Sequence, residues 1–445
     1  MTALRSKGLD PTKGDKMSGS IEEKTGRKES RVEAWIQDKL VPRMNKITQN
    51  YWFSLIAEGI LYIVPFTMVS AIPSLWGVIR KAAPGLIDLT PLSTYSFGLV
   101  GMFMVFIVPY KCMVRENKKD RSLMAGFAGI GVYMLCMNAQ TTDDGTLFDI
   151  GKFGSGGLFT AMVLGLVTAA IFKAFAGKSF FSEDSMVPDF VKSWLDNIVS
   201  ILLTLTVGFV LTTILSIDVF TIIGYIISPL TNFAQSLPGV VLISVVMDMF
   251  YFFGVSGWAF TPFTIPITQG AIAENAANFA AGLPVTNINA YGLSRYYMIG
   301  GEGNTLPLAI MMLFSKSQKN KTLGKATIAT SVVNINEPLI FSTVVDNPYM
   351  FLPMLLQSII LPANAWLWLN FGWASKHVAM FAMNNLPNAV SAFFLSNGDI
   401  RNVVLVCVNL ALATLIWFPF WKAYDNNEYR KEQEAARKKQ AEKEE

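Results

Sequence analysis

Long apolar runs separated by short polar segments fill most of the chain after residue 52. The clearest run, residues 53–79, holds 27 residues with a single charge, Glu58. A helix that crosses a bilayer needs about 20 mostly apolar residues. The runs lack the alternation of a barrel strand, so their backbone is satisfied in lipid only as helices. Further apolar runs cover residues 95–110, 123–138, 156–172, 198–217, 219–247, 298–314, 349–375 and 402–421. The pattern predicts an all-α polytopic membrane protein.

The second half of the chain is less regular than the first. Residues 219–237 contain Gly224 and Pro229 and are a candidate interfacial helix before a span that begins at Pro238. Polar segments rich in Pro, Gly and Asn interrupt the apolar pattern, and they occupy residues 257–270, 331–347 and 378–397. Irregular backbone at membrane depth is tolerated where it is buried in protein or lines a water-filled cavity. Such segments commonly build the substrate site of a transporter. We therefore expect the site in the second half.

Composition and charge agree with a membrane protein. Apolar residues make up 52% of the chain and charged residues 15%, with a mean hydropathy of +0.40. Cytoplasmic loops carry an excess of Lys and Arg, which here cluster in the N-terminus and in residues 111–121, 173–192, 316–325 and 422–445. Asp143, Asp144 and Asp149 make the loop after the third span acidic, which suits the outside. Both termini inside require an even number of spans, so we expect about ten, one of them within residues 258–281.

The chain divides into four predicted parts. Residues 1–48 form a polar N-terminal extension, rich in Lys and Arg, with a possible short interfacial helix at 36–46, and they do not resemble a cleaved signal peptide. Two transmembrane halves follow, at 49–217 and 218–421, and a charged tail occupies 422–445. The spacing of Cys112, Cys136 and Cys407 fits neither a metal site nor a disulfide framework. We expect no metal, no cofactor and no nucleic-acid partner.

Acidic residues within the apolar regions are the first candidates for chemistry. An ionisable side chain in a membrane costs at least about 2.5 kcal/mol, so it needs a partner or a purpose. Glu337 follows Asn334 and Asn336 and precedes the helix-breaking Pro338. A carboxylate and two amides suit a ligand with many hydroxyls. Helix capping and an ion or proton site are the alternatives. The remaining acids of this kind are Glu58, Asp248, Glu302 and Asp346.

Two further motifs contribute candidate residues. Gly300-Gly-Glu-Gly-Asn-Thr-Leu306 contains three glycines, which let backbone approach a ligand or a facing helix, and it offers Glu302 and Asn304. Tight helix packing is the alternative for this motif. In the aromatic segment 250–258, ring faces could stack on any ligand with a partly apolar ring, and Ser256 and Trp258 could hydrogen-bond to it. A lipid-interface aromatic belt would explain the same segment.

These motifs resemble the membrane IIC component of the bacterial phosphoenolpyruvate-dependent sugar phosphotransferase system, in its lactose/cellobiose/diacetylchitobiose branch. The resemblance is carried by Phe252-Phe-Gly-Val-Ser-Gly257, Ile299-Gly-Gly-Glu-Gly-Asn-Thr-Leu306, residues 314–324, Asn334-Ile-Asn-Glu-Pro-Leu-Ile-Phe341 with Asn347-Pro348, and the closing segments 397–401 and 408–425. It implies a multi-pass permease of the bacterial cytoplasmic membrane, with ten spans and with re-entrant segments in the second half.

The resemblance also assigns roles to the halves and names partners. It implies that residues 49–217 form a scaffold through which the protein dimerises, and that residues 218–421 enclose a disaccharide and carry it across the membrane. The sugar is then phosphorylated by a separate IIB protein, itself supplied by IIA. The implied substrate-binding residues are Asn334, Asn336, Glu337, Ser256, Trp258, Phe253, Glu302 and Asn304, with no catalytic residue in this chain.

The sequence departs from the family pattern at two of these positions. Ser256 stands where family members commonly have a histidine, and Glu302 stands where they commonly have a serine. A IIC-like facilitator, an ion-coupled carrier or a sugar sensor without phosphorylation is therefore an alternative. A membrane scaffold that uses residues 422–445 as a docking helix is a third possibility.

Overall fold

The computed structural model describes residues 50–143, 145–181, 186–254, 260–379 and 385–444. The predicted N-terminal extension, Ser256 and Trp258 lie outside these ranges. The first part of the described chain is a series of helices with a small hairpin between α6 and α7. Its elements are α3 (Tyr51–Ala82), α4 (Thr90–Thr94), η3 (Phe97–Leu99), α5 (Val100–Arg115), α6 (Lys119–Cys136), β1 (Gln140–Thr142), β2 (Gly145–Leu147), α7 (Ile150–Phe153), η4 (Ser155–Gly157), α8 (Leu158–Phe175), α9 (Asp189–Phe209) and η5 (Val210–Ile214).

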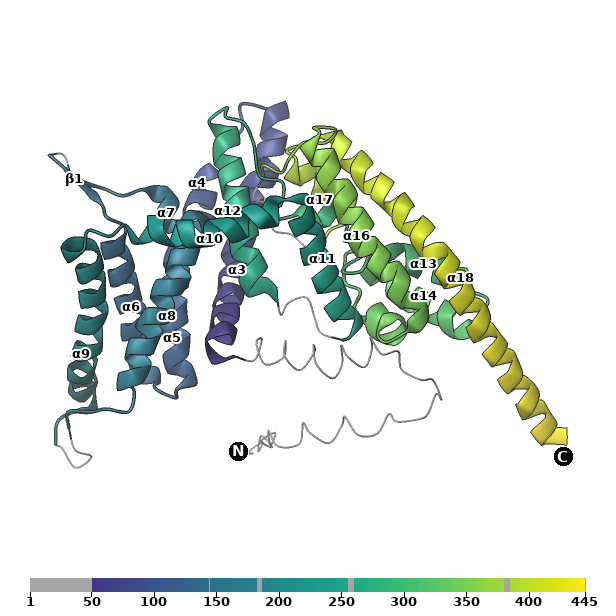
Figure 1. The fold of residues 1–445 in the computed structure, drawn as a ribbon, viewed down its shortest axis with the longest axis horizontal. Coiled ribbons are helices and arrows are strands. Elements are labelled where there is room, and N and C mark those ends of the chain that lie inside the picture. The colour runs from purple at the N-terminus through teal and green to yellow at the C-terminus, as the bar shows by residue number, and fades with distance from the viewer. Residues whose placement is uncertain (1–49, 144, 182–185, 255–259, 380–384, 445) are drawn as a thin grey trace, which may run out of the picture. The chain divides into compact units, whose positions relative to one another are not determined.

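Helices α5, α6, α8 and α9 lie side by side (Figure 1). Small residues allow the close approach of α5 and α6, since a Cβ at Gly129 would lie 2.4 Å from the carbonyl oxygen of Val105. A buried ion pair, Arg121 Nη2 to Asp196 Oδ2 at 3.1 Å, fastens the start of α6 to α9. The buried apolar residues of these helices form one cluster together with Leu55 of α3 and with Val219.

The second part of the described chain contains shorter and more interrupted helices. They are α10 (Val219–Gln235), α11 (Leu237–Phe252), α12 (Thr261–Ala280), η7 (Leu293–Tyr296), α13 (Leu306–Leu313), α14 (Gln318–Val332), α15 (Glu337–Leu339), η8 (Ile340–Val344), α16 (Pro348–Asn370), α17 (Asn388–Leu395) and α18 (Ile400–Glu444). Their largest buried apolar clusters, such as the one from Val240 to Ala413, are separate from the cluster of the first part. The division near residue 217 stays a prediction, with which this separation agrees.

The predicted break between residues 219–237 and the next span is present. Helices α10 and α11 meet at an angle of 84°. The Ser236 hydroxyl oxygen accepts a hydrogen bond from the N–H of Gly239 at 3.2 Å and so caps α11. Because of the bend, α10 lies close to the membrane plane if α11 crosses it. Figure 1 shows α10 running across the end of α8, which it contacts.

The structure confirms an all-α fold with several membrane-spanning helices. Within the described residues, five helices are long and apolar enough to cross a membrane, or six if α10 and α11 form one span. They cover Thr90–Arg115, Ser155–Phe175, Val191–Ile214, Pro348–Asn370 and Ile400–Glu442. The total of about ten therefore stays a prediction.

One of the apolar runs is not a continuous span. Residues 298–314 contain helix α13, whose 8 residues extend about 12 Å at the usual rise. Before it, Gly300, Gly301, Gly303 and Asn304 all adopt positive φ angles. Glycine and asparagine tolerate this left-handed conformation, so the apolar run contains a tight loop.

Candidate functional site

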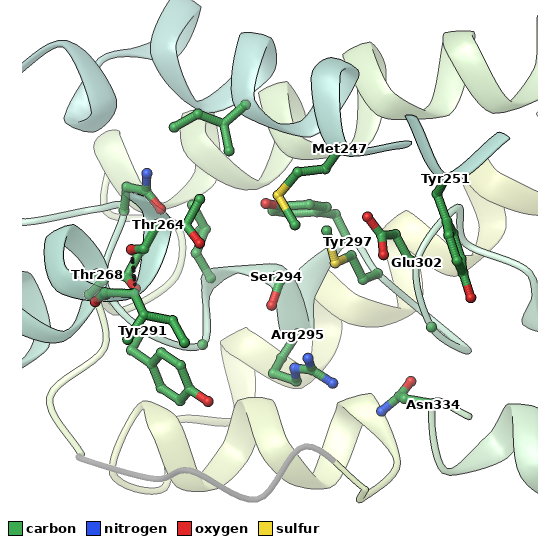
Figure 2. A pocket seen from close by; sticks show the side chains of 18 of the residues that line it. Met247, Tyr251, Thr264, Thr268, Tyr291, Ser294, Arg295, Tyr297, Glu302 and Asn334 are labelled. Atoms are coloured by element: carbon green, nitrogen blue, oxygen red, sulfur yellow. Dashed lines mark hydrogen bonds between the residues drawn. The ribbon is translucent and has the colours of Figure 1, made fainter. Parts of the chain in front are cut away.

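A cavity of about 320 Å³ lies in the second part of the chain. Its walls come from α11, α12, η7, the loop before α13 and the segment between α14 and α15 (Figure 2). Tyrosine rings and the side chains of Met247 and Met298 line it together with many polar groups. The polar lining residues are Tyr251, Thr264, Thr268, Asn289, Tyr291, Ser294, Arg295, Tyr297, Glu302, Asn334, Asn336, Glu337 and Asn385. The irregular backbone of this region thus surrounds a cavity, and its role as the substrate site stays a prediction.

Four of the eight predicted site residues meet at this cavity, namely Glu302, Asn334, Asn336 and Glu337. Glu302 lies in the loop before α13, and the other three lie just after α14. Helices α13 and α14 therefore separate the two loops in the sequence. The N–H of Gly300 donates to Asn334 Oδ1 at 3.0 Å. The Asn336 side-chain amide donates to the carbonyl of Glu302 at 2.7 Å and to Thr305 Oγ1 at 2.8 Å. The asparagines therefore join the two loops to each other.

Close packing explains why these loops need glycine. At Gly301, whose φ is 100°, a Cβ would lie 2.5 Å from the Asn336 side chain. The N–H of Gly303 donates to the carboxylate of Asp248 on α11, a residue that is 1% exposed. Asn334 adopts a φ of 64° directly after α14, and its side-chain amide donates to the carbonyl of Leu386 at 2.7 Å. The two loops are consequently held on several sides.

Arg295 is a cavity residue that sequence reasoning missed. It lies in η7, and its guanidinium points into the cavity on the side of Asn334 (Figure 2). Asn388 Nδ2 donates to the Arg295 carbonyl at 2.8 Å, and Asn409 Nδ2 donates to the Tyr296 carbonyl at 2.8 Å. The segment is therefore fixed by α17 and α18. The sequence contained a sign that Arg295 is a site residue, because it is the only Lys or Arg between Lys192 and Lys316.

Two predicted site residues are described but lie elsewhere. Asn304 Oδ1 accepts a hydrogen bond from the N–H of Ile299 at 3.0 Å, so its side chain shapes the glycine-rich loop. Phe253 packs edge-on against Phe252, with ring centroids 5.1 Å apart, within an apolar cluster. Neither side chain lines the cavity, and the structure assigns both to the packing around it.

The cavity combines charges of both signs with aromatic faces. Glu302 and Glu337 offer carboxylate oxygens, and Arg295 offers hydrogen-bond donors. In Figure 2 the Glu302 side chain lies between Tyr297 and Tyr251. In the described part of the chain, no three His, Cys, Asp or Glu residues are grouped so that they could hold a metal ion. The arrangement suits an uncharged, hydroxyl-rich ligand with an apolar face.

Comparison with known proteins identifies the family. Residues 54–358 match the family described as "Phosphotransferase system, EIIC". The chain belongs to this family. It is therefore a IIC component, the sugar-translocating membrane subunit of a phosphotransferase system, and such components act with IIA and IIB proteins and a sugar.

The similarity to known proteins extends over most of this IIC chain. The lichenan permease IIC component of Bacillus subtilis (strain 168) is 23% identical over 440 residues, which cover 91% of this chain and 96% of the relative. The lactose-specific EIICB component of Streptococcus mutans is 24% identical over 418 residues, covering 87% and 72%. The crystal structure of ChbC, the IIC component from the N,N'-diacetylchitobiose-specific phosphotransferase system, matches with a TM-score of 0.82 at 21% identity, covering 90% of this chain and 99% of ChbC. The fold is thus that of a IIC transporter.

Proposed function

We propose that the cavity binds a disaccharide-type sugar, which this IIC component carries across the bacterial cytoplasmic membrane for phosphorylation by a separate IIB protein. The observation that carries this proposal is the cavity of about 320 Å³ lined by Arg295, Glu302, Asn334 and Glu337. Small-molecule sites usually enclose about 300–1,000 Å³ and place a few polar groups in an apolar wall. The names of the relatives refer to lichenan, lactose and diacetylchitobiose.

The lining residues receive distinct roles in this proposal. Glu337 and Glu302 accept hydrogen bonds from sugar hydroxyls, and Arg295 donates to ring and hydroxyl oxygens. The rings of Tyr251 and Tyr297 lie against the apolar face of the sugar. Asn334 and Asn336 act mainly by joining the two loops, since their side chains bond to backbone. Ser256 and Trp258 stay candidates from the sequence.

Glu337→Gln tests the proposed role of the cavity. A hydrogen bond to a charged group contributes about 1.5–3 kcal/mol, so we expect uptake affinity to fall by about 10- to 100-fold. The measurement is uptake of labelled lactose, cellobiose and diacetylchitobiose by cells with and without the gene, and then with the variant. The control is Glu434→Gln in the exposed tail. Uptake unchanged by Glu337→Gln would contradict the assignment.

Glu302 favours a second candidate, a facilitator or ion-coupled carrier that moves unmodified sugar. This residue lines the cavity at a position where members of the IIC family commonly have serine. It therefore adds an acid to the site. Purified protein in liposomes distinguishes the two candidates. Flux of unmodified sugar without IIB would support the carrier, whereas accumulation only as sugar phosphate would exclude it.

We further propose that the protein is a homodimer formed through residues 49–217, with residues 218–421 as the moving half and both termini cytoplasmic. The separate buried clusters of the two parts support a division of roles. The Lys- and Arg-rich segments support the orientation. The mass of the protein in nanodiscs tests the dimer, and labelling of single cysteines placed at 316–325 and 422–445 tests the orientation.

A further inference from the structure

The charged tail at the end of the chain continues the last membrane helix without a break. Helix α18 runs over 45 residues, or about 67 Å at 1.5 Å per residue. The hydrocarbon core of a bilayer is only about 30 Å thick, so a large part of α18 projects beyond it. Figure 1 shows α18 passing beside α13 and α14 before it reaches the C-terminus. The tail is thus placed by the same helix that supports the cavity.

Three acidic residues, Asp425, Glu428 and Glu432, occupy one face of the projecting helix. Their spacing of three and four residues places them on successive turns of that face. Asp425 and Glu428 are only 7% and 9% exposed, although they belong to a highly charged segment. Glu434, two residues beyond Glu432, is exposed. Asp425 and Glu428 are therefore covered by another element, and Glu432 is half-buried.

That element is the beginning of α14. The carboxylate of Glu432 accepts hydrogen bonds from the backbone N–H of Gln318 and of Lys319, both at 3.0 Å. It also accepts from the Ser317 hydroxyl at 2.7 Å. The first N–H groups of a helix have no partner within the helix and form its positive end. Glu432 thus satisfies the N-terminus of α14 from a helix more than 100 residues away in the sequence.

Asp425 and Glu428 extend this contact. Asp425 accepts hydrogen bonds from the Lys316 N–H at 3.0 Å and from Asn320 Nδ2 at 3.1 Å, and also from the Ser315 hydroxyl. Glu428 forms an ion pair with Lys319 at 3.1 Å. Together the three carboxylates hold the loop between α13 and α14 and the first turn of α14.

The other end of α14 leads directly into the cavity wall. Its 15 residues span about 22 Å. Just after them, the N–H of Asn334 donates to the Ser331 carbonyl at 3.1 Å and the N–H of Ile335 to the Thr330 carbonyl at 2.9 Å. Asn334, Asn336 and Glu337 then line the cavity. A displacement of the first turn of α14 is consequently transmitted along a stiff helix to these residues.

We propose that Asp425 and Glu432 are positioning residues for the sugar cavity: by holding the start of α14 on the projecting part of α18, they set the place of Asn334 and Glu337. The inference rests on the proposed function of the cavity. It makes the tail up to Glu432 part of the transport machinery, whereas residues beyond Gln433 have no such role.

Hydrogen exchange and sugar binding of the full-length protein in nanodiscs test this inference. The variants are Glu432→Ala and Asp425→Asn, with Glu434→Ala as the matched control on the exposed face. We expect faster exchange in Glu432→Ala both at residues 316–320 and at residues 333–340. For whichever of lactose, cellobiose and diacetylchitobiose binds the wild type, we expect Kd to rise by about threefold to tenfold. Glu432→Asp should restore part of the affinity.

Each outcome decides the inference. Faster exchange confined to residues 316–320, or a Kd equal to that of Glu434→Ala, would overturn it. A protein truncated after Gln433 should bind like the wild type, and a loss of binding there would also contradict it. If the wild type binds none of the three sugars, the proposed function fails on its own, and exchange at residues 333–340 still decides whether the tail positions the cavity wall.

Discussion

Arg295 places a planar guanidinium with several hydrogen-bond donors in the cavity, together with the acids Glu302 and Glu337. The position of Arg295 is fixed through the backbone of η7, which Asn388 and Asn409 hold. Under the proposed function, a sugar that enters the cavity meets a donor that is already in place, which reduces the entropy lost on binding.

Asp399, between α17 and α18, makes stability depend on pH. Hydrogen bonds from Arg401 hold the pKa of its carboxyl at about 2, below the value of about 3.9 in an unfolded chain. A lowered pKa stabilises the folded state above the unfolded value, and this contribution is lost as pH falls towards the folded value. We expect the free energy of unfolding to decrease between about pH 4 and pH 2 by less in Asp399→Asn than in the wild type. Unfolding of both proteins in detergent measures this, and equal decreases would contradict it.

At the scale of elements, the bend between α10 and α11 depends on one glycine. A Cβ at Gly239 would lie 1.9 Å from the carbonyl oxygen of Phe233, which is backbone and cannot move aside easily. We expect Gly239→Ala to destabilise the protein by about 1–3 kcal/mol, as measured by thermal unfolding of the purified protein.

The control for this prediction is Gly224→Ala in α10, where a Cβ would meet no atom within 4 Å. Alanine is favoured over glycine within a helix by about 0.5–1 kcal/mol, so this variant should be neutral or slightly more stable. If both variants unfolded at the wild-type temperature, the bend would not depend on close backbone contact at Gly239.

In the whole molecule, the second part has buried clusters of its own, although its Val219 and Ile265 belong to or pack against the cluster of the first part. The cavity is lined by residues of α11, α12, η7 and the loops before α13 and after α14, and by Asn385, so sugar bound there as proposed contacts only the second part. We expect sugar to slow hydrogen exchange at residues 290–306 and 333–340 and to leave α5 and α8 unchanged. The measurement is exchange with and without the sugar that binds, and equal protection of α5 and α8 would contradict it.

The membrane class and the all-helical fold follow from the residues alone, whereas the place of the site in the second half stays a prediction. Lipid offers no hydrogen-bond partners to backbone N–H and C=O groups, so apolar runs of this length form helices, which pair these groups internally. The break at Ser236 and the irregular segments could also be predicted from the sequence, because Pro, Gly and Asn act locally on the backbone. The motifs around Glu302 and Glu337 also pointed to the family, which the match over residues 54–358 confirms.

Tertiary packing specifies which side chains face the cavity and which hold its walls. Asn304 and Asn336 belong to equally polar motifs, yet one shapes its own loop and the other joins two loops and lines the cavity. Arg295 reaches the cavity because α17 and α18 fix η7, and Glu432 finds its partners at the start of a distant helix. Such contacts depend on long-range packing, and no local pattern of residues specifies them.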